Sequence, residues 1–481
     1  MPGSIDSVNS PTAESPLVAA VLAGLWARLA DIPRPPAIWV GLSGGRDSLA
    51  LLDILAGARA ELPAPLVAVN VDHGLTKDSV LWSARCATEA AQREVEFIAL
   101  KIERKPSPGD SLEAWAREAR YRLIAANLPR DAVFVTAHHV DDLAETFLLN
   151  ALRGAGPHGL RGIAPLRRLG AGWLLRPMLE VPGSAIAAWT AQRRLVPLED
   201  PMNADPRLAR SFVRHEVMPL LSTRWPAAAG ILARNARHQS TVAASLDAFA
   251  DHLLADGVQF GDGLRIEALR KLAPSVAREV VRRWLNQQGL AAPDIRTWEE
   301  IQVSLLTAGP DRQPSIRMGP YRLRRHADLL HVVEDTPLVP FDIPWPVDEA
   351  LVLPHGTLVA EPVVGEGLAR RWALQGLTVR GRLGGERCRL PGRAHRTRLK
   401  HVLQDLRIPP WKRAGLPLLY LGDTLAAVAD LVVCEGFGAG PGEAGLRLCW
   451  KPQGLPSVGE AWHHQRMATD TLARLSSPDC D

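Results

Sequence analysis

One stretch near the N-terminus decides the fold: Ala37-Ile-Trp-Val-Gly-Leu42, then Ser43-Gly-Gly-Arg-Asp-Ser48, then the helical pattern from Leu49 to Ala58. The first part is a short apolar run of the kind that forms a buried strand. The two adjacent glycines permit positive φ and let the backbone approach a ligand closely. A helix that begins directly after them presents unpaired N–H groups and a partial positive charge, which suit a phosphate. The lysine of a Walker A loop is absent, and for these six residues alone an ordinary tight strand-to-helix turn is the alternative.

The alternation of apolar strand and helix continues from this stretch to residue 153. We expect strands at 66–71, 96–102 and 132–136, and helices at 79–93, 111–127 and 142–153. Nearly all-apolar strands that alternate with helices indicate a parallel sheet covered on both faces, so the fold class is α/β with a doubly wound parallel sheet. The second strand ends in Asp72-His73-Gly74, and such sheets bind ligands outside the carboxyl ends of their strands. Together with residues 43–48, this ending favours a nucleotide site.

After residue 226 the pattern changes. Long amphipathic helices are expected at 227–254 and 275–288, followed by short strand-like pieces. We expect an α/β catalytic domain (1–226), a helical domain (227–335), a proline-rich connection with a few short strands (336–375), a small basic α+β domain (376–450) and a disordered tail (451–481).

The distribution of charge is more informative than its total. The chain has 56 Lys and Arg residues against 52 Asp and Glu, a net charge of +4. The segment 380–413 alone holds eleven basic and two acidic residues, which leaves 45 basic and 50 acidic residues elsewhere. A segment of +9 on a body of −5 suggests a polyanionic partner.

Several classes of protein are excluded. The longest apolar runs fall short of the roughly 20 residues that span a bilayer, so no membrane association is expected. The first residues lack the basic region of a signal peptide. The five cysteines lie far apart, without a C-x-x-C pair, which fits a reducing cytoplasm better than a disulfide framework or a zinc site. The oligomeric state stays open, with a homodimer as one option.

Several motifs resemble those of a known family. Residues 43–48 are similar to the signature of the PP-loop ATP pyrophosphatases, which adenylate a substrate carbonyl and release pyrophosphate. The remaining motifs resemble the tRNA(Ile)-lysidine synthetases and occur in order along the chain, although the central domain rests on position alone. They are Val71-Asp-His-Gly-Leu75, Glu113-x-x-Ala-Arg-x-x-Arg-Tyr121, Ala137-His-His-x-Asp-Asp-x-x-Glu-Thr146, Leu152-Arg-Gly-x-Gly-x-x-Gly-Leu160, Glu199-Asp-Pro-x-Asn203, Arg210-x-x-x-Arg214, Gly385-Glu-Arg387, and Leu399-Lys400 through Trp411.

The resemblance implies a PP-loop ATPase fold of the adenine nucleotide alpha hydrolase-like type, followed by a substrate-binding and a C-terminal domain that both contact tRNA. It also implies a two-step ligase that uses ATP with Mg²⁺, free L-lysine and an isoleucine tRNA with a CAU anticodon. ATP adenylates the C2 carbonyl of the wobble cytidine, and the ε-amine of lysine then attacks C2 and releases AMP. The product, lysidine, changes the codon specificity from AUG to AUA. Physically, adenylation turns a poor leaving group into a good one, and the phosphate loop with Mg²⁺ neutralises the departing pyrophosphate.

The acidic residues after His138-His139 are expected on one helix, where Glu145 shares a face with Asp141 and Asp142. Clustered carboxylates need solvent or a cation, and two cations fit: the Mg²⁺ that accompanies ATP, or the ammonium of a lysine substrate. Two alternatives stay open: an acidic helix start that complements the helix dipole, and a metal site that includes the histidines. No further protein ligands support zinc, so we expect no metal other than the Mg²⁺ carried by ATP.

The motifs assign expected roles to individual residues. The nucleotide is expected at the phosphate loop and at positions on the matching motifs: Ser43, Gly44, Gly45, Arg46, Asp47, Ser48, His73, Arg117 and His138. Lysine binding and proton transfer are expected from Asp47, Asp142 and Glu145. Contacts to tRNA phosphates are expected from Arg210, Arg214, Arg387, Arg393, Arg396, Arg398, Lys400, Lys412 and Arg413. Trp411 could stack on a base or lie in a core.

Two positions depart from the family pattern, because Met202 replaces a Ser or Thr and Ser211 replaces an Asn. Two other functions stay open. A tRNA thiolase of the same superfamily would need paired cysteines, which the chain lacks. A tRNA-binding protein without catalysis would not need the intact phosphate loop or Glu145.

Overall fold

The computed structural model describes residues 15–74, 79–103, 112–198, 207–309, 314–335, 339–393, 395–406 and 408–452. The chain divides into two compact units, residues 1–245 (unit 1) and 246–481 (unit 2). The expected motif at 199–203 and the expected tail beyond residue 452 lie outside the described residues. Among the helices within them, none is both long and apolar enough to cross a membrane.

Unit 1 is built on a sheet with the strand order β3-β2-β1-β4-β6-β5. All neighbouring pairs are parallel except β5 and β6, which form an antiparallel hairpin at one edge. The strands are β1 (Ile38–Gly41), β2 (Leu66–Asp72), β3 (Glu96–Lys101), β4 (Val133–Val135), β5 (Leu166–Leu169) and β6 (Gly172–Leu175). The predicted parallel sheet is confirmed, whereas the β5–β6 hairpin was not anticipated because its strands are short and partly charged.

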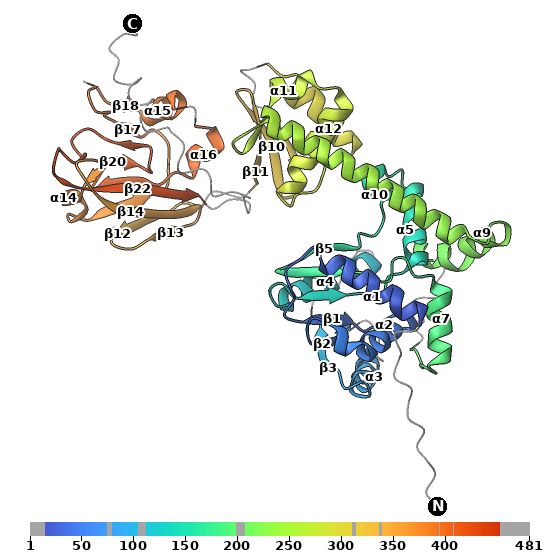
Figure 1. The fold of residues 1–481 in the computed structure, drawn as a ribbon. Coiled ribbons are helices and arrows are strands. Elements are labelled where there is room, and N and C mark those ends of the chain that lie inside the picture. Colours follow the sequence, from blue (N-terminus) through green and yellow to red (C-terminus); the bar gives the residue numbers. More distant parts are fainter. Residues whose placement is uncertain are drawn as a thin grey trace, which may run out of the picture. The chain divides into compact units, whose positions relative to one another are not determined.

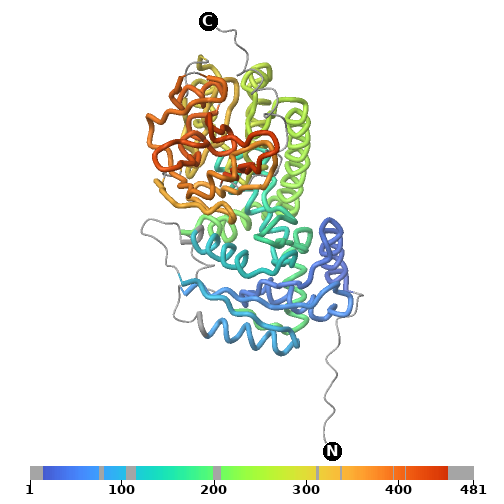
Figure 2. Tube along the Cα trace, turned by 90° about the vertical axis from the view of Figure 1, so that its left-hand side faces the viewer, coloured from blue at the N-terminus to red at the C-terminus, as the bar shows by residue number. Residues whose placement is uncertain are grey.

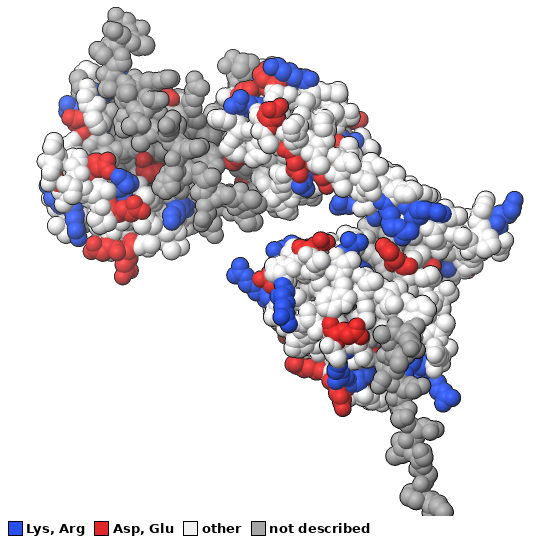
Figure 3. All heavy atoms as spheres, in the orientation of Figure 1, with Lys and Arg blue, Asp and Glu red and all other residues white. Residues whose placement is uncertain are grey.

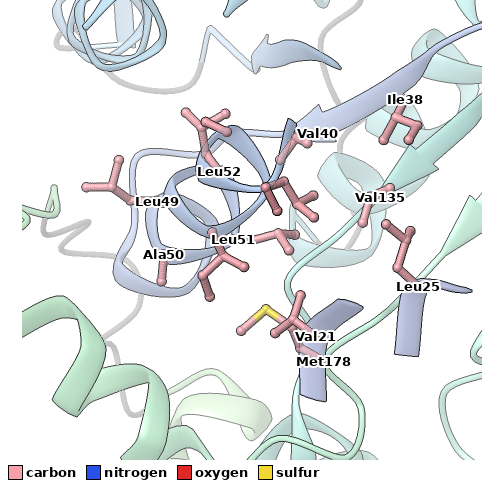
Figure 4. Packing of buried hydrophobic residues seen from close by; sticks show 14 of the residues in the cluster. Val21, Leu25, Ile38, Val40, Leu49, Ala50, Leu51, Leu52, Val135 and Met178 are labelled. Atoms are coloured by element: carbon pink, nitrogen blue, oxygen red, sulfur yellow. The ribbon is translucent and has the colours of Figure 1, made fainter. Parts of the chain in front are cut away.

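Helices cover both faces of this sheet, as Figures 1 and 2 show. Alternate residues of a strand point to opposite faces; Ile38 and Val40 therefore join the core with α1, α2, α3 and α7, and Trp39 joins the core with α4. Figure 4 shows the first core, where Leu51 of α2 lies near Val40 and Val21. The helices are α1 (Pro16–Leu29), α2 (Arg46–Gly57), a 3-10 turn (Arg59–Glu61), α3 (Ser79–Ala91), α4 (Leu112–Asn127), α5 (Val140–Leu152), α6 (Pro157–Leu160), α7 (Gly183–Gln192), α8 (Ala209–Phe212), a π-turn (Val213–Val217), α9 (Met218–Arg224) and α10 (Ala228–Leu253), which runs on into unit 2.

The first part of unit 2 is not only helical. It combines helices with a sheet in the order β7-β8-β11-β10-β9, and the two share a core that includes Trp284, Leu323 and Leu330. Its elements are a π-turn (Leu254–Val258), β7 (Gln259–Phe260), β8 (Gly263–Arg265), α11 (Ile266–Lys271), α12 (Pro274–Gln287), α13 (Ile295–Glu300), a second π-turn (Ile301–Leu306), β9 (Ser315–Met318), β10 (Tyr321–His326) and β11 (Leu329–Glu334).

The last part of unit 2 has two further sheets, β12-β16-β19-β20-β21 and β13-β14-β22-β15, around one core. The structure differs here from the expected connection at 336–375, because β12 to β15 supply strands to both sheets and Trp345 and Leu358 to the core. Long-range strand pairing, not local composition, makes this segment part of the domain. The elements are β12 (Asp342–Trp345), β13 (Leu351–Leu353), β14 (Gly356–Val364), β15 (Leu368–Ala369), α14 (Arg370–Ala373), β16 (Leu377–Arg380), β17 (Arg387–Cys388), β18 (Thr397–Arg398), α15 (Leu399–Asp405), α16 (Pro410–Ala414), β19 (Leu418–Leu421), β20 (Thr424–Val428), β21 (Val432–Val433) and β22 (Ala444–Pro452).

Candidate active site and basic surface

The predicted phosphate loop lies between β1 and α2, at the carboxyl edge of the sheet. Gly44 has φ +82°, and a Cβ there would come within 2.5 Å of the Leu198 Cδ1, so only glycine fits without strain. The Ser43 and Ser48 hydroxyls are 3.1 Å apart, and Ser48 Oγ donates to the Gly45 carbonyl at 2.9 Å. The Ser48 hydroxyl therefore shapes the loop from inside, whereas Ser43 is exposed beside the helix N-terminus.

Asp47 in the first turn of α2 connects this loop to the acidic helix. Its Oδ1 accepts from Arg46 Nε at 2.8 Å, and its Oδ2 lies 3.5 Å from His139 Nε2. Burial acts to raise the pKa of Asp47, but the hydrogen bonds and charges of His139 and Arg46 outweigh it and lower this pKa. Asp47 is thus held as a carboxylate at the end of the phosphate loop.

His139 is buried and joins the carboxylates of two elements. Its ring nitrogens lie 3.5 Å from Asp47, 3.3 Å from Asp141 and 3.6 Å from Asp142. Burial alone would lower the pKa of His139, but these carboxylates raise it to about 10, so the ring is an imidazolium at neutral pH. The prediction named His139 only as part of a motif; its role as the cation between Asp47 and Asp142 requires the fold.

Two arginines form ion pairs with the carboxylates of α5. Arg210 donates to Glu145 at 3.0 Å and to Asp142 at 2.9 Å. Arg214 donates to both oxygens of Glu145, at 2.6 and 2.9 Å, and to Asp142 at 2.8 Å. The Glu145 side chain is only 2% exposed. Arg210 and Arg214 were expected to contact tRNA; here they hold the acidic site of unit 1 instead, because α8 and the π-turn after it pack beside α5.

The formal charges of this cluster balance. The carboxylates of Asp47, Asp141, Asp142 and Glu145 face the guanidiniums of Arg46, Arg210 and Arg214 and the imidazolium of His139. In this arrangement the predicted lysine site is already filled by cations of the protein. Within the described part of the chain, no group of His, Cys, Asp or Glu is placed to hold a metal ion.

The two other histidines that were predicted to bind the nucleotide, His73 and His138, follow the ends of β2 and β4 at the same edge of the sheet. Arg120 Nε and Nη2 contact His73 Nε2 at 3.2 and 3.0 Å, and burial and Arg120 lower the pKa of His73 to about 4. His138 Nδ1 lies 2.9 Å from Thr136 Oγ1, and burial lowers the pKa of His138 to about 3. Both rings are therefore neutral hydrogen-bonding groups. Arg120 was quoted in a motif but given no role, and only its contact with His73 identifies it.

Five of the predicted tRNA contacts form a basic surface in unit 2. Arg387 of β17 and Arg398 of β18 are directly opposite each other in the hairpin register, and like charges in such a pair repel. Together with Arg393, Arg396 and Lys400 they are exposed, and among the described residues no carboxylate pairs with any of the five. The positive charge of these five side chains is therefore available to attract an anion.

The residues of α16 are placed differently. Lys412 Nζ pairs with Asp262 Oδ2 at 2.9 Å, and Arg413 is buried and donates to the Ile408 carbonyl at 2.6 Å. Trp411 packs against His331, with the ring centroids 5.4 Å apart. We therefore leave Arg413 and Lys412 out of the proposed tRNA surface, because packing against other parts of unit 2 already uses both side chains.

Comparison with known proteins agrees with this arrangement. Family models match a PP-loop domain at residues 24–221, a TilS substrate binding domain at 264–331 and a TilS substrate C-terminal domain at 377–450. The chain is 36% identical over 421 residues to the tRNA(Ile)-lysidine synthase of Coxiella burnetii. The matched region covers 86% of this chain and 93% of that protein. It is 37% identical over 407 residues to the enzyme of Alkalilimnicola ehrlichii, covering 84% and 91%, and 35% over 422 residues to that of Methylococcus capsulatus, covering 86% and 96%. Likeness of this extent, over nearly the whole length of each relative, shows that the chain belongs to the tRNA(Ile)-lysidine synthase family.

Proposed function

We propose that this chain is an ATP-dependent ligase that joins L-lysine to C2 of the wobble cytidine of the CAU-anticodon isoleucine tRNA, with AMP and pyrophosphate as products. The observation that carries the proposal is the link between two sites. The His139 imidazolium lies within 3.6 Å of both Asp47, at the phosphate loop, and Asp142, in the acidic cluster. An adenylating site and a site for an ammonium are thus adjacent.

In the first step, the C2 carbonyl oxygen of the cytidine attacks the α-phosphorus of ATP, and the bond to pyrophosphate breaks. We assign binding of the departing phosphates to the N–H groups at the start of α2 and to the Ser43 hydroxyl, which is exposed beside them. His138 is neutral at pH 7, so it can donate one hydrogen bond without adding charge. His73 is also neutral, but its Nε2 accepts from Arg120, so it positions that arginine. Mg²⁺, when bound with ATP, would offset the negative charge of the pyrophosphate.

In the second step, the lysine Nζ forms a bond to C2, and the C2–oxygen bond to AMP breaks. The lysine ammonium transfers one proton to a nearby carboxylate before the attack, and the nitrogen releases a second proton to solvent once the bond to C2 has formed, keeping one N–H. We assign binding of the lysine ammonium to Asp47, Asp142 and Glu145. Because the cluster is neutral as it stands, the ammonium is accommodated when one arginine leaves its carboxylates. Arg210 makes two hydrogen bonds to these carboxylates and Arg214 makes three, so we expect Arg210 to be the one that moves.

A direct assay tests the function. Purified full-length protein is incubated with ATP, Mg²⁺ and an unmodified transcript of the isoleucine tRNA, with lysine, without lysine, or with arginine or ornithine in its place. We expect lysidine and AMP only when lysine is present. A thiolase would release pyrophosphate without incorporating lysine, and a tRNA-binding protein without catalysis would release none; either outcome would overturn the proposal.

A further inference from the structure

A groove lined by several arginines lies on unit 1, outside the phosphate loop. This open groove of about 480 Å³ runs between α4 and the edge strand β5. It is lined by Arg117, Glu118, Tyr121, Arg122, Arg167 and Leu169. Figure 3 shows Lys and Arg side chains along the edge of unit 1 beside α4 and β5.

Two of the three arginines that line this groove have no carboxylate partner among the described residues. The guanidiniums of Arg117 and Arg167 lie 5.3 and 5.0 Å from the centre of the Tyr121 ring. Arg122 pairs with Glu118, whereas neither Arg117 nor Arg167 has a carboxylate partner in the part of the chain that the structure describes. The cation–π contacts hold the two guanidiniums beside the ring. Arg167 Nη1 donates to the Arg168 carbonyl at 3.2 Å, which leaves its Nε and Nη2 groups for a ligand.

A buried arginine below the ring adds to this charge. Arg176 is 4% exposed and shares a hydrogen bond with Tyr121, and its buried Nε has no hydrogen-bond partner among the described residues. Burial lowers the pKa of Arg176, and the nearby charges of Arg167 and Arg117 lower it further. Arg117, Arg167 and Arg176 thus surround one tyrosine, while Glu118, the carboxylate that lines the groove, is paired with Arg122. A bound anion would reduce the repulsion among the three guanidiniums.

The position of Arg167 distinguishes this anion from ATP, whereas Arg117, at the same groove, is a residue that the motifs assign to the nucleotide. Leu169 of β5 and Leu174 of β6 belong to the core under α4, whereas the phosphate loop leads into α2 on the opposite face of the sheet. Arg167 alternates with Arg168 along β5 and shares the α4 face with Leu169. If tRNA is the substrate, as proposed above, it is the polyanion available to this face.

We propose that the groove between α4 and β5 binds a backbone phosphate of the tRNA, with Arg167 as its main ligand. The site is electrostatic and reads no base, because the Tyr121 ring already contacts two guanidiniums, at 5.3 and 5.0 Å from its centre. It holds the RNA on the catalytic domain itself, independently of the basic surface in unit 2.

The test compares two neighbouring arginines in the full-length protein. Arg167→Ala removes the proposed ligand. Arg168→Ala is the matched control, because Arg168 is also exposed but stacks on Trp173 at 3.8 Å and pairs with Asp131 at 3.6 Å. Loss of one phosphate contact lowers the slope of log affinity against log salt by about 0.7–0.9, which corresponds to about five- to eightfold weaker binding at roughly 0.1 M salt. Binding of an unmodified transcript of the tRNA is measured over a salt series.

We expect the loss and the shallower slope for Arg167→Ala, near wild-type binding for Arg168→Ala, unchanged ATP affinity in both, and recovery with Arg167→Lys. Three outcomes would overturn the proposal: an equal loss of tRNA affinity in both alanine variants, unchanged tRNA affinity in Arg167→Ala, or a loss of ATP affinity in Arg167→Ala with tRNA affinity unchanged. The two proposals can fail separately. An inactive wild type whose tRNA binding still depends on Arg167 would overturn the function alone, and an active wild type whose binding is indifferent to Arg167 would overturn the groove alone.

Discussion

The ion pair between Glu145 and Arg214 is expected to be one of the strongest single interactions of unit 1. Arg214 Nε and Nη2 donate to the two Glu145 oxygens at 2.6 and 2.9 Å, which is a bidentate charge-assisted pair. Hydrogen bonds to charged groups contribute about 1.5–3 kcal/mol each. Because Arg214 is 39% exposed and solvent competes for it, the lower end applies, and two bonds give about 3 kcal/mol.

A double-mutant cycle measures this value. Glu145→Gln, Arg214→Ala and the double variant are compared with the wild type by calorimetric denaturation of the full-length protein. We expect a coupling free energy of about 2–3 kcal/mol and a fall of roughly 6–12 °C in the midpoint of the transition of unit 1 for Glu145→Gln. The variant should also form no lysidine, because the proposed ammonium site has lost a charge.

The control is Glu94→Gln, since the pair of Glu94 with Arg59 is exposed, with Glu94 at 85% and Arg59 at 46%. An exposed pair of this kind contributes about 0–1 kcal/mol, so this variant should melt near the wild-type temperature. A coupling energy for Glu145 and Arg214 below about 0.5 kcal/mol, the range of surface pairs, would refute the reasoning. So would a Glu145→Gln enzyme that forms lysidine at the wild-type rate.

Two further predictions concern the same site. The pKa of His139 is raised to about 10, so its protonation stabilises the fold fully below the unfolded-state pKa of 6.5, and this contribution is lost as the pH rises through 10. Urea denaturation between pH 6 and 10 should show falling stability for the wild type and little such fall for His139→Gln; parallel pH profiles would contradict this. Gly44→Ala should lower stability by about 2 kcal/mol, because positive φ is costly for alanine and its Cβ meets Leu198. Gly45→Ala, at φ −69° with Ser43 Oγ no nearer than 3.5 Å, should melt like the wild type, and equal melting of both variants would disprove the steric account.

Local patterns were sufficient to predict the central sheet. The apolar runs ending near Gly41 and Asp72 form β1 and β2 close to their expected bounds, because a strand buried on both faces is apolar throughout. The β5–β6 hairpin escaped prediction because Arg167 and Arg168 interrupt its apolar pattern. Residues 342–369 were predicted as a connection because prolines interrupt their strand pattern. Their strands form by pairing with distant partners, as β14 does with β22.

The sequence predicted which carboxylates belong to the candidate site, but it did not predict their ion-pair partners. Asp47, Asp142 and Glu145 stay the proposed lysine ligands. Their arginine partners on and just after α8 lie 65 to 72 residues further along the chain than the carboxylates of α5. The periodicity of the sequence does not predict such an ion pair. A long polar side chain meets its partner only when the elements that carry the two residues pack together. Lys412 illustrates the same point, since its carboxylate, Asp262, is 150 residues away.

The sequence by itself determined the order of strands and helices in the catalytic domain, the glycine loop between β1 and α2, and the excess of basic residues at 380–413. Each depends on neighbouring residues, through backbone conformation, periodic burial or local charge. Only the tertiary structure decided which of those charges stay available to a ligand. It placed Arg210, Arg214 and Lys412 on carboxylates, and it left Arg167, Arg387 and Arg398 without such a partner among the residues that the structure describes. The energy of an ion pair depends on distance and burial, and both arise when separate elements pack together.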